Sequence, residues 1–343
     1  MNILIVGSNK IWAFENHYIK HLKSLCADVS SFPAHDIFYE YYYKNIFKKI
    51  IFRSGLSNIY KKINSLLIEN VSKYKYDIVW IFKGMEIFPQ TIEQIKRTGC
   101  KVVNFNPDHP FDFTFRGSGN KNVLNSISKY DLHLCYSIPV MERIKKEFKI
   151  PALWLPFGYE ETEITLPDEN SEIKRVCFIG NPDKHRAGMI KKLASAKTPI
   201  AVYGNNWKEW IKPNTKYNIK YHDAIYKDNF NKTAPLYRIQ LNFFRPQNKD
   251  SHNMRTFEMP GLGCIMLAPD SNEHHILFKE NEEAFFYKNF DDMLFQVKKI
   301  MKLDFDEAYK IRQNAIQRCQ TSGYNYKTRA KDVTLYFKNI RNT

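Results

Sequence analysis

The pattern that most constrains the fold is an apolar run, a glycine turn and a helical segment that occur twice along the chain. Residues 1–6 are mostly apolar and lead into Gly7 and a helical pattern. Residues 175–179 lead into Gly180 and a second helical pattern. Strand, glycine turn and helix is how a Rossmann-like domain begins. Two such starts predict an α/β protein with two Rossmann-like domains facing each other across a cleft.

The spacing of apolar runs and polar segments predicts the domain boundaries. We expect an N-terminal domain over residues 1–160, a polar, acidic linker over 161–174, a second domain over 175–323 and a last helix over 324–343. A GxGxxG motif is absent, which disfavours a dehydrogenase. Further strands are expected at residues 77–83, 101–105, 130–136, 152–155, 200–204, 264–268 and 284–287.

The charge balance points to an anionic partner. The chain of 343 residues has a formal net charge of +16, with 43% hydrophobic residues as in ordinary globular proteins. Nucleic acid is disfavoured as that partner, because neither zinc-finger spacing nor an RNP-like motif occurs. A phosphorylated substrate or an anionic membrane surface accounts for the charge equally well.

The cysteines and the N-terminus indicate the compartment. The six cysteines lie far apart without a CxxC pair, so we expect core residues in a reducing cytosol, with no metal site and no disulfide. No apolar run approaches the roughly 20 residues of a membrane span, and no signal peptide is expected. The predicted location is cytoplasmic, with peripheral attachment to the inner face of the cell membrane left open.

The most informative stretch is a short helix followed by a glycine break and a buried strand. Asp250, Ser251 and Asn253 precede the helix and are capable N-caps. A helix N-terminus favours a phosphate. Arg255 adds a fork of N–H donors, and Glu258 one turn later accepts from vicinal hydroxyls. Cations for a diphosphate and carboxylates for ribose and sugar are what a sugar nucleotide requires.

These residues carry a family resemblance. Residues 254–258 (MRTFE), followed by Gly263 and by residues 278–281 and 286–287, resemble the C-terminal domain of CgeB-like glycosyltransferases. That spore-maturation group belongs to the GT-B glycosyltransferases and is related to the large retaining family 4. Family 4 enzymes carry two glutamates eight positions apart, one on the donor sugar and one on the ribose. Glu258 matches the second of these.

The chain departs from the family pattern at two points. Asp250 stands where family 4 has its first glutamate, with a shorter side chain for the sugar-binding role. Pro260 and Gly261 stand where the family helix continues with alanines, so this helix is expected to end early. The GT-B resemblance also implies that the last helix crosses back onto the N-terminal domain.

The resemblance implies a set of site residues in the second domain. It places Arg186 on the sugar donor's diphosphate, aided by Gly180 and the helix start, and it makes residues 204–207 and 221–223 the rim of the nucleobase pocket. The expected nucleotide-sugar-binding residues are Gly180, Arg186, Gly204, Asn205, Trp207, His222, Asn253, Arg255 and Glu258.

A polar loop in the first half is the expected acceptor site. Residues 106–112 follow a predicted strand, and loops at the carboxyl ends of parallel strands face the ligand crevice. Asp108 and His109 are the candidate bases there, and CgeB-like sequences tend to have an acidic, proline-containing loop at this place. The alternative is ordinary turn chemistry, since Asp and Pro are common turn residues.

A basic and aromatic stretch precedes that loop. Residues 39–62 interleave lysines and Arg53 with tyrosines, phenylalanines and isoleucines. Such a composition on a helix suits an interfacial segment on anionic lipid, and membrane-associated GT-B enzymes use their N-terminal domain in this way. The alternative is an amphipathic helix with a solvated basic face.

Together these features predict a GT-B glycosyltransferase that moves a sugar from a nucleotide diphosphate sugar to a cell-envelope glycan or lipid-linked acceptor. It is expected to need neither metal nor cofactor. Asp250, Glu258, Asp108 and His109 are the candidate catalytic residues. The spacing of Asp250 and Glu258 favours retention over inversion. The alternatives are a GT-B sugar-nucleotide epimerase and a non-catalytic envelope or polyanion-binding protein that keeps the fold.

Overall fold

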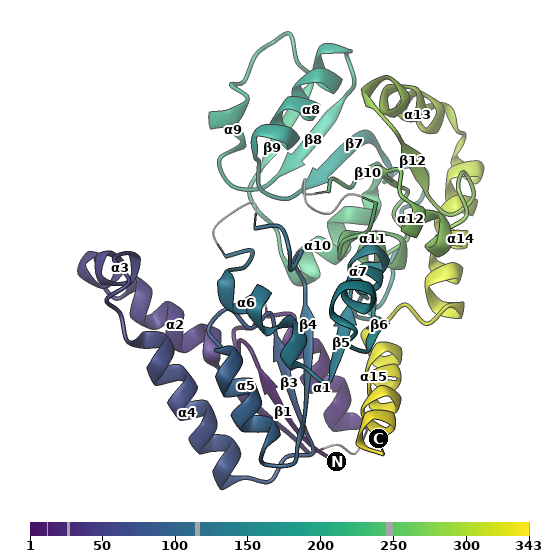
Figure 1. The fold of residues 1–343 in the computed structure, drawn as a ribbon. Helices are drawn as coiled ribbons and strands as arrows, with labels where there is room; N and C mark the ends of the chain where they lie inside the picture. Colours follow the sequence, from purple (N-terminus) through teal and green to yellow (C-terminus); the bar gives the residue numbers. More distant parts are fainter. Residues whose placement is uncertain (12, 26–27, 114–116, 245–249, 343) are drawn as a thin grey trace. The chain divides into compact units, whose positions relative to one another are not determined.

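The structure is a computed structural model that describes residues 1–11, 13–25, 28–113, 117–244 and 250–342. The chain divides into two compact units (Figure 1). The first contains Met1–Pro156 together with the final helix, and the second extends from Phe157 to Asn325. Two Rossmann-like α/β units confirm the predicted fold class.

The first unit is built on a parallel six-stranded sheet with the order β2-β1-β3-β4-β5-β6. Side chains of a strand alternate between the two faces, and both faces of this sheet are covered, which is why its strands read as apolar runs. The strands are β1 (Asn2–Val6), β2 (Asp28–Phe32), β3 (Ile78–Phe82), β4 (Lys101–Asn106), β5 (Leu132–Cys135) and β6 (Ala152–Trp154).

Helices cover the two faces of the first sheet, as Figure 1 shows. Val79 and Ile81 of β3 point into a core with α4 and α5, whereas Trp80 packs against Tyr18 of α1 and Phe337 of α15. The final helix therefore packs on the first helix of the chain. The helices are α1 (Glu15–Ser24), α2 (Ala34–Tyr43), α3 (Ile46–Arg53), α4 (Ile59–Lys73), α5 (Pro89–Lys96), α6 (Lys121–Ser126), α7 (Ile138–Phe148) and α15 (Tyr326–Arg341).

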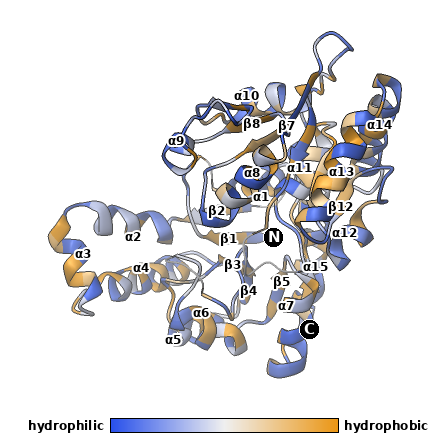
Figure 2. Cartoon of the chain, turned by 90° about the horizontal axis from the view of Figure 1, so that it is seen from above, coloured by the Kyte–Doolittle hydropathy of each residue, from blue (hydrophilic) through white to orange (hydrophobic). Residues whose placement is uncertain are grey.

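The basic and aromatic stretch is not one helix but parts of three. Asn45 begins α3, its side chain accepting a hydrogen bond from the Lys48 N–H, and so separates α3 from α2. Gly55, at φ +78°, lies between α3 and α4. None of the residues of α3 is buried. Within its unit, α3 lies at the far end of α2 and α4 from the sheet (Figures 1 and 2).

The second unit has its own parallel six-stranded sheet, in the order β12-β11-β10-β7-β8-β9. Counted from its first strand, this is the 3-2-1-4-5-6 order of a dinucleotide-binding domain. The strands are β7 (Ile173–Ile179), β8 (Ile200–Tyr203), β9 (Ile219–His222), β10 (Tyr237–Leu241), β11 (Met266–Pro269) and β12 (Phe285–Tyr287).

Helices complete the core of the second unit. Val176 and Phe178 of β7 pack with Ile190 and Leu193 of α8 in one buried cluster. The helices are α8 (Lys184–Ser195), α9 (Trp207–Trp210), α10 (Lys227–Thr233), α11 (Arg255–Gly261), α12 (Asn272–Leu277), α13 (Phe290–Lys302) and α14 (Phe305–Thr321).

A buried ionic group ties α14 to the sheet. Arg312 of α14 and Arg238 of β10 both bind the Glu172 carboxylate. Burial opposes charge on Glu172, but hydrogen bonds from the two arginines outweigh it and lower its pKa. Arg312 also donates to the Gly263 carbonyl oxygen at 3.0 Å, which anchors the turn after α11.

Three local expectations can be compared with the structure. The residues expected to form a linker, 161–174, lie in the second unit, and β7 already begins at Ile173. The strand expected at 264–268 begins two residues later, because the chain first turns at Gly263, at φ +77°. The helix expected to end near Pro260 ends at Gly261, as predicted. Met254 precedes it, and the expected capping residue Asn253 accepts from the Thr256 N–H at 3.2 Å.

The structure also bears on membrane spans and on the cysteines. Of the helices in the described part of the chain, none is both long and apolar enough to cross a membrane. The five cysteines that the structure describes are buried, and Cys26 lies outside the described residues.

Candidate active site

The second sheet has a topological switch point between β7 and β10. From β7 the chain continues toward β8 on one side, whereas β11 and β12 follow β10 on the other. In open α/β sheets such a point leaves a crevice at the carboxyl ends of the strands, where ligands bind. Gly180 follows β7, and Asn242 and Phe243 follow β10. The candidate site is built around these residues.

The turns after β7 and β8 are joined by short-range contacts. The Trp207 indole Nε1 donates to the Gly180 carbonyl oxygen at 2.9 Å, and the Asn205 N–H donates to the Asn181 side chain at 3.0 Å. Gly204 lies at φ +153°, and a Cβ there would be 2.4 Å from the Gly180 oxygen. Only glycine allows this approach. The structure thus brings together four of the predicted residues, from two turns 24 positions apart in the sequence.

A small pocket opens beside these turns. Its volume is about 250 Å³, and it is lined by Gly204, Asn206, Trp207, Lys208, Glu209, Tyr221, His222 and Asp223. The His222 ring stacks on Tyr203 with centroids 4.3 Å apart. Burial, with smaller contributions from Lys220 and Arg175, lowers the pKa of His222 and favours its neutral form. A pocket of this size, with the rings of Trp207, Tyr221 and His222 in its lining, suits a heterocyclic base.

Arg186 lies in the first turn of α8. Asp183 caps this helix by accepting from the Arg186 N–H at 2.9 Å. The Arg186 guanidinium donates to the Asn181 carbonyl oxygen at 3.1 Å and lies over the Phe178 ring, 5.4 Å from its centroid. Its charge is therefore held at the N-terminal end of α8, where the helix dipole also favours an anion.

The start of α11 brings the second predicted group together. Arg255 donates to Glu258 at 2.9 Å, and its guanidinium lies over the Phe230 ring at 4.0 Å. The Asn253 side chain donates to the Asn242 side-chain oxygen at 2.7 Å and accepts from the Thr256 N–H at 3.2 Å. Asn253 thus joins the end of β10 to the first turn of α11.

Phe243 lies between the two helix starts. Its ring is 5.1 Å from Phe178 and 6.0 Å from His185 by centroid distance, and its carbonyl oxygen accepts from Asn253 at 3.3 Å. The starts of α8 and α11 therefore flank one residue at the end of β10. Arg186 and Arg255 are each within one turn of those starts.

Asp250 is bound within its own unit. Its two carboxylate oxygens accept from the N–H and the side-chain amide of Asn272, at 2.8 and 2.9 Å. Asn272 is the first residue of α12, so Asp250 satisfies a backbone donor at that helix start. The adjacent Ser251 and His252 both bind Glu273. This attachment of the loop to α12 was not predicted from the sequence.

The predicted acceptor residues lie in the first unit, after β4. Asp108 forms an ion pair of 2.6 Å with Lys83, which follows β3. His109 lies beside Phe111, whose N–H donates to the His109 Nδ1 at 3.4 Å. Burial lowers the pKa of His109, so its neutral form is favoured. A neutral imidazole and a carboxylate are thus adjacent in this loop.

A second polar group in this unit is not among the predicted site residues. His35 follows β2 and Glu86 follows β3, and their side chains are 2.7 Å apart. Both follow strands closely, which is the signal that would have found them.

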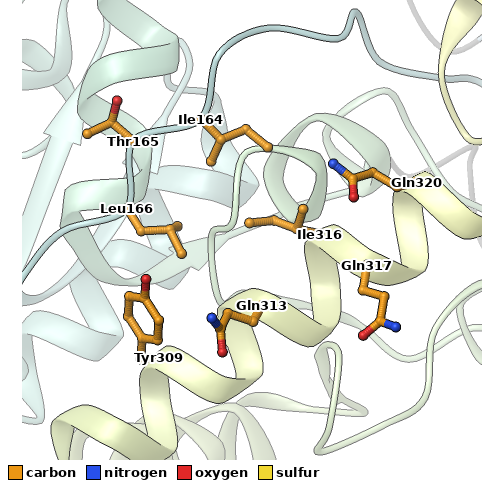
Figure 3. A pocket seen from close by; sticks show the side chains of 8 residues that line it. All are labelled: Ile164, Thr165, Leu166, Tyr309, Gln313, Ile316, Gln317 and Gln320. Atoms are coloured by element: carbon orange, nitrogen blue, oxygen red, sulfur yellow. The ribbon is translucent and has the colours of Figure 1, made fainter.

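A larger pocket lies elsewhere in the second unit (Figure 3). Its volume is about 510 Å³, and it lies between residues 164–166 and one side of α14. Its lining contains none of the predicted site residues. It consists of Ile164, Thr165, Leu166, Tyr309, Gln313, Ile316, Gln317 and Gln320.

Comparison with known proteins supports a glycosyltransferase fold. A family model described as "Glycosyl transferase-like" matches residues 186–334. The chain has the GT-B fold. Together the matching domain and the GT-B neighbours support an enzyme of glycosyl transfer. None of the curated proteins matches the chain.

Several solved structures resemble the whole chain. Anabaena HepE, solved with UDP-glucose, has a TM-score of 0.68 at 10% identity, and the match covers 99% of this chain and 100% of HepE. Sucrose-phosphate synthase of Thermosynechococcus elongatus gives 0.69 at 9% identity, covering 99% of both chains. A Rickettsia africae glycosyltransferase gives 0.65 at 14% identity, covering 99% of this chain and 98% of that one. The narrower CgeB-like resemblance stays a prediction.

Proposed function

We propose that this GT-B enzyme transfers a sugar from a UDP-sugar to a lipid-linked or other membrane-held glycan acceptor of the cell envelope, without a metal ion and with retention. The observation that carries the proposal is the pair of helix starts around Phe243, with Arg186 on one and the Arg255–Glu258 pair on the other. The UDP-glucose complex of the HepE structure supports the choice of nucleotide.

The reaction requires stabilisation of a leaving diphosphate. When the bond between the sugar C1 and the phosphate oxygen breaks, its electron pair goes to UDP, and the acceptor oxygen bonds to C1. In a retaining reaction the departing phosphate oxygen takes the acceptor proton, so no protein base is required. Arginine side chains and helix N–H groups that are already in place stabilise the negative charge that develops on the diphosphate as the bond breaks. Arg186, Arg255 and the start of α8 have this role in the proposal.

The nucleoside has its own contacts in the proposal. Glu258 is half-buried, and its carboxylate accepts hydrogen bonds from the ribose hydroxyls. The pocket beside Gly204, Trp207 and His222 holds the base. The hydrogen bond from Arg255 orients the Glu258 carboxylate before the sugar donor arrives. Asp250 is the carboxylate proposed to face the donor sugar.

Helix α3 supports the membrane-held acceptor. Ile46, Phe47 and Ile50 on α3 are 60%, 70% and 55% exposed, and the lysines of this helix lie on the same exposed element. Figure 2 shows apolar and polar residues alternating around it. Such a helix binds anionic lipid by inserting its apolar side and by pairing its cations with headgroups. The proposed location is therefore the cytoplasmic face of a membrane.

Calorimetry and turnover test the sugar-donor part. We expect UDP to bind the purified protein, and UDP-glucose to be turned over at an unchanged rate after treatment with EDTA. CDP and ADP serve as nucleotide controls. Release of an epimerised sugar in place of a transferred one would favour an epimerase. Failure of UDP, GDP, ADP and CMP alike to bind would favour a non-catalytic protein.

Vesicle co-sedimentation tests the membrane part. We expect the protein to sediment with phosphatidylglycerol vesicles at low salt. Added salt should release it, because at physiological ionic strength charges more than about 8 Å apart are screened from each other. Phe47→Ser should reduce sedimentation, whereas Phe295→Ser should not, although Phe295 on α13 is similarly exposed at 63%. Equal loss in both variants, or no binding by the wild type, would remove the membrane from the proposal.

A further inference from the structure

The first sheet has a switch point of its own, between β1 and β3. The chain leaves β1 toward β2 on one side, and β3 leads to β4 on the other. Gly7 and Ser8 follow β1, and residues 83–86 follow β3. By the same rule that locates the sugar-donor site, a ligand is expected at these carboxyl ends. None of the predicted sugar-donor residues belongs to this unit.

A histidine–carboxylate pair lies there. The His35 Nδ1 is 2.7 Å from the Glu86 carboxylate, and the two side chains are 15% and 3% exposed. The His35 backbone N–H donates to the Gly7 carbonyl oxygen at 3.0 Å, which fixes the residue at the end of β1. Asn64 of α4 donates to the Glu86 carbonyl oxygen at 2.8 Å and holds the loop. In the described residues, no hydrogen bond to the His35 Nε2 is present.

The surrounding charges favour hydroxyl groups over phosphates. Asp36 accepts from the Ser8 hydroxyl at 2.8 Å, Glu15 accepts from the Ser8 N–H at 3.0 Å, and Lys83 is paired with Asp108. Among the described residues, Glu15, Asp36 and Glu86 thus bring three carboxylates to this edge, and Lys83 is already paired with Asp108. Carboxylates accept hydrogen bonds and repel anions, so this edge suits a ligand rich in hydroxyls.

Aromatic rings extend this edge along α2. Tyr39 and Tyr43 follow His35 at intervals of four residues, which places all three on one side of the helix. The two rings stack with centroids 5.9 Å apart, and the residues are 41% and 63% exposed. Burial raises the pKa of Tyr39, and Glu86, Tyr43 and Asp108 add to the effect, so its hydroxyl lies near those carboxylates. The exposed parts of these rings are apolar with a polar tip, and the Lys49 Nζ lies over the Tyr43 ring, 4.8 Å from its centroid.

We propose that His35, Tyr39 and Tyr43 form the acceptor-binding surface, with a saccharide hydroxyl on the His35 Nε2 and sugar rings on the two tyrosines. Glu86 is a positioning residue that holds the imidazole through Nδ1. The proposal rests on the proposed function, because it names where the acceptor of that reaction binds. The surface runs along α2 toward α3, so an acceptor anchored in a membrane would reach it along the tyrosines.

The His35 Nε2 donates or accepts a hydrogen bond according to the protonation of the imidazole. Burial opposes charge on His35, but the charge and hydrogen bond of Glu86 outweigh it, and Glu15 adds to Glu86 while Lys83 opposes it. The pKa of His35 is therefore raised. Below that pKa, Nε2 donates to the oxygen of a hydroxyl, and above it Nε2 accepts from the hydroxyl proton.

Saturation-transfer NMR with methyl glycosides tests the surface directly. The probes are the methyl α- and β-glycosides of glucose, galactose, mannose and N-acetylglucosamine at millimolar concentration. We expect transfer to at least one of them from the wild type, at least a fivefold smaller signal from His35→Ala and Tyr39→Ala, and no change from His21→Gln and Tyr74→Ala. His21 is in the last turn of α1 and Tyr74 follows α4, both at the opposite end of the sheet.

A ring-nitrogen spectrum separates contact from a structural effect. In protein labelled with ¹⁵N-histidine, the His35 signal is assigned by its loss in His35→Gln. The glycoside that binds should shift the Nε2 signal more than the Nδ1 signal. In Glu86→Gln the ring loses its charged partner, and we expect weaker glycoside binding with an intact fold. Absence of transfer to all eight glycosides, or binding that survives His35→Ala, would overturn the proposal.

Calorimetry with UDP separates this proposal from the proposed function. His35→Ala and Tyr39→Ala should bind UDP with the wild-type affinity, because neither residue is among the predicted sugar-donor contacts. If the wild type binds a glycoside at His35 but no nucleotide, the proposed function fails and this surface stands. If UDP binds and is turned over while glycosides ignore His35, the acceptor surface fails alone.

Discussion

Glu258 accepts a hydrogen bond from Arg255 one helical turn earlier, so a change at either residue alters both. We expect Glu258→Ala to weaken UDP binding by one to two decades, since a hydrogen bond to a charged group contributes about 1.5–3 kcal/mol. Calorimetry with UDP measures the change. Glu282→Ala is the matched control, because Glu282 forms a similar i, i+3 pair with Lys279 on an exposed turn. An unchanged affinity in Glu258→Ala would contradict the ribose-binding role.

Gly204 is required by backbone geometry. It lies at φ +153°, and a Cβ added there would be 2.4 Å from the Gly180 oxygen, so alanine forces the two turns apart. We expect Gly204→Ala to lower the free energy of unfolding by about 1–3 kcal/mol and to weaken UDP binding. Gly188→Ala is the control, since that glycine on α8 has open space around it and alanine favours a helix by about 0.5–1 kcal/mol. Thermal unfolding with and without UDP compares the two variants.

His133 should make stability depend on pH. Burial lowers its pKa to about 4, although its hydrogen bond to the Ile127 carbonyl oxygen opposes the shift. Between pH 4 and about 6.5 the unfolded chain binds a proton at this residue that the folded chain does not, so the free energy of unfolding falls as pH falls. The expected slope is about 1.4 kcal/mol per pH unit. Urea unfolding should show a shallower slope in His133→Gln, and an identical slope would exclude His133 as the cause.

At the scale of elements, the start of α12 decides what Asp250 contributes. Its carboxylate binds Asn272 there. The Asp250 backbone lies at φ +58°, a conformation that Asn and Gly also adopt. Asp250→Asn should keep the hydrogen bond from the Asn272 N–H but lose the one from the Asn272 side-chain amide, because its own NH2 group cannot accept. It should lower turnover of UDP-glucose if the charge acts on the donor sugar. Asp250→Gly should in addition lose the hydrogen bond from the Asn272 N–H, at a cost of about 0.5–1.5 kcal/mol of stability. Urea unfolding and turnover separate the two effects, and full turnover in Asp250→Asn would leave Asp250 a capping residue.

At the scale of the whole molecule, the sugar-donor residues all belong to one unit. The described parts of the turns after β7 and β8 and of α11 lie between Phe157 and Asn325. A ligand at 100 times its Kd stabilises the folded state by about 2.7 kcal/mol. We therefore expect UDP to slow hydrogen exchange in peptides covering β7, β8 and α11, with mass spectrometry as the measurement. Protection confined to peptides of β1–β6 would contradict the assignment of the nucleotide to the second unit.

The amino-acid sequence by itself predicted what depends on neighbours along the chain. Local patterns predicted the two strand–glycine–helix starts, the parallel strands and the turn that joins Gly204 to Trp207. Each pattern is either a periodic spacing of apolar residues or a glycine after an apolar run. The contact between the Gly180 and Gly204 turns depends in addition on β7 and β8 lying side by side, which the sequence did not predict.

Only the tertiary structure decided how distant residues pair. Asp250 binds Asn272 and His35 binds Glu86 across 22 and 51 positions, and no local pattern relates such residues. The order of the strands in each sheet, and hence the place of each switch point, is likewise a property of the packed fold. Local propensity acts between residues a few positions apart, whereas these pairings depend on which strands lie side by side once the cores are buried.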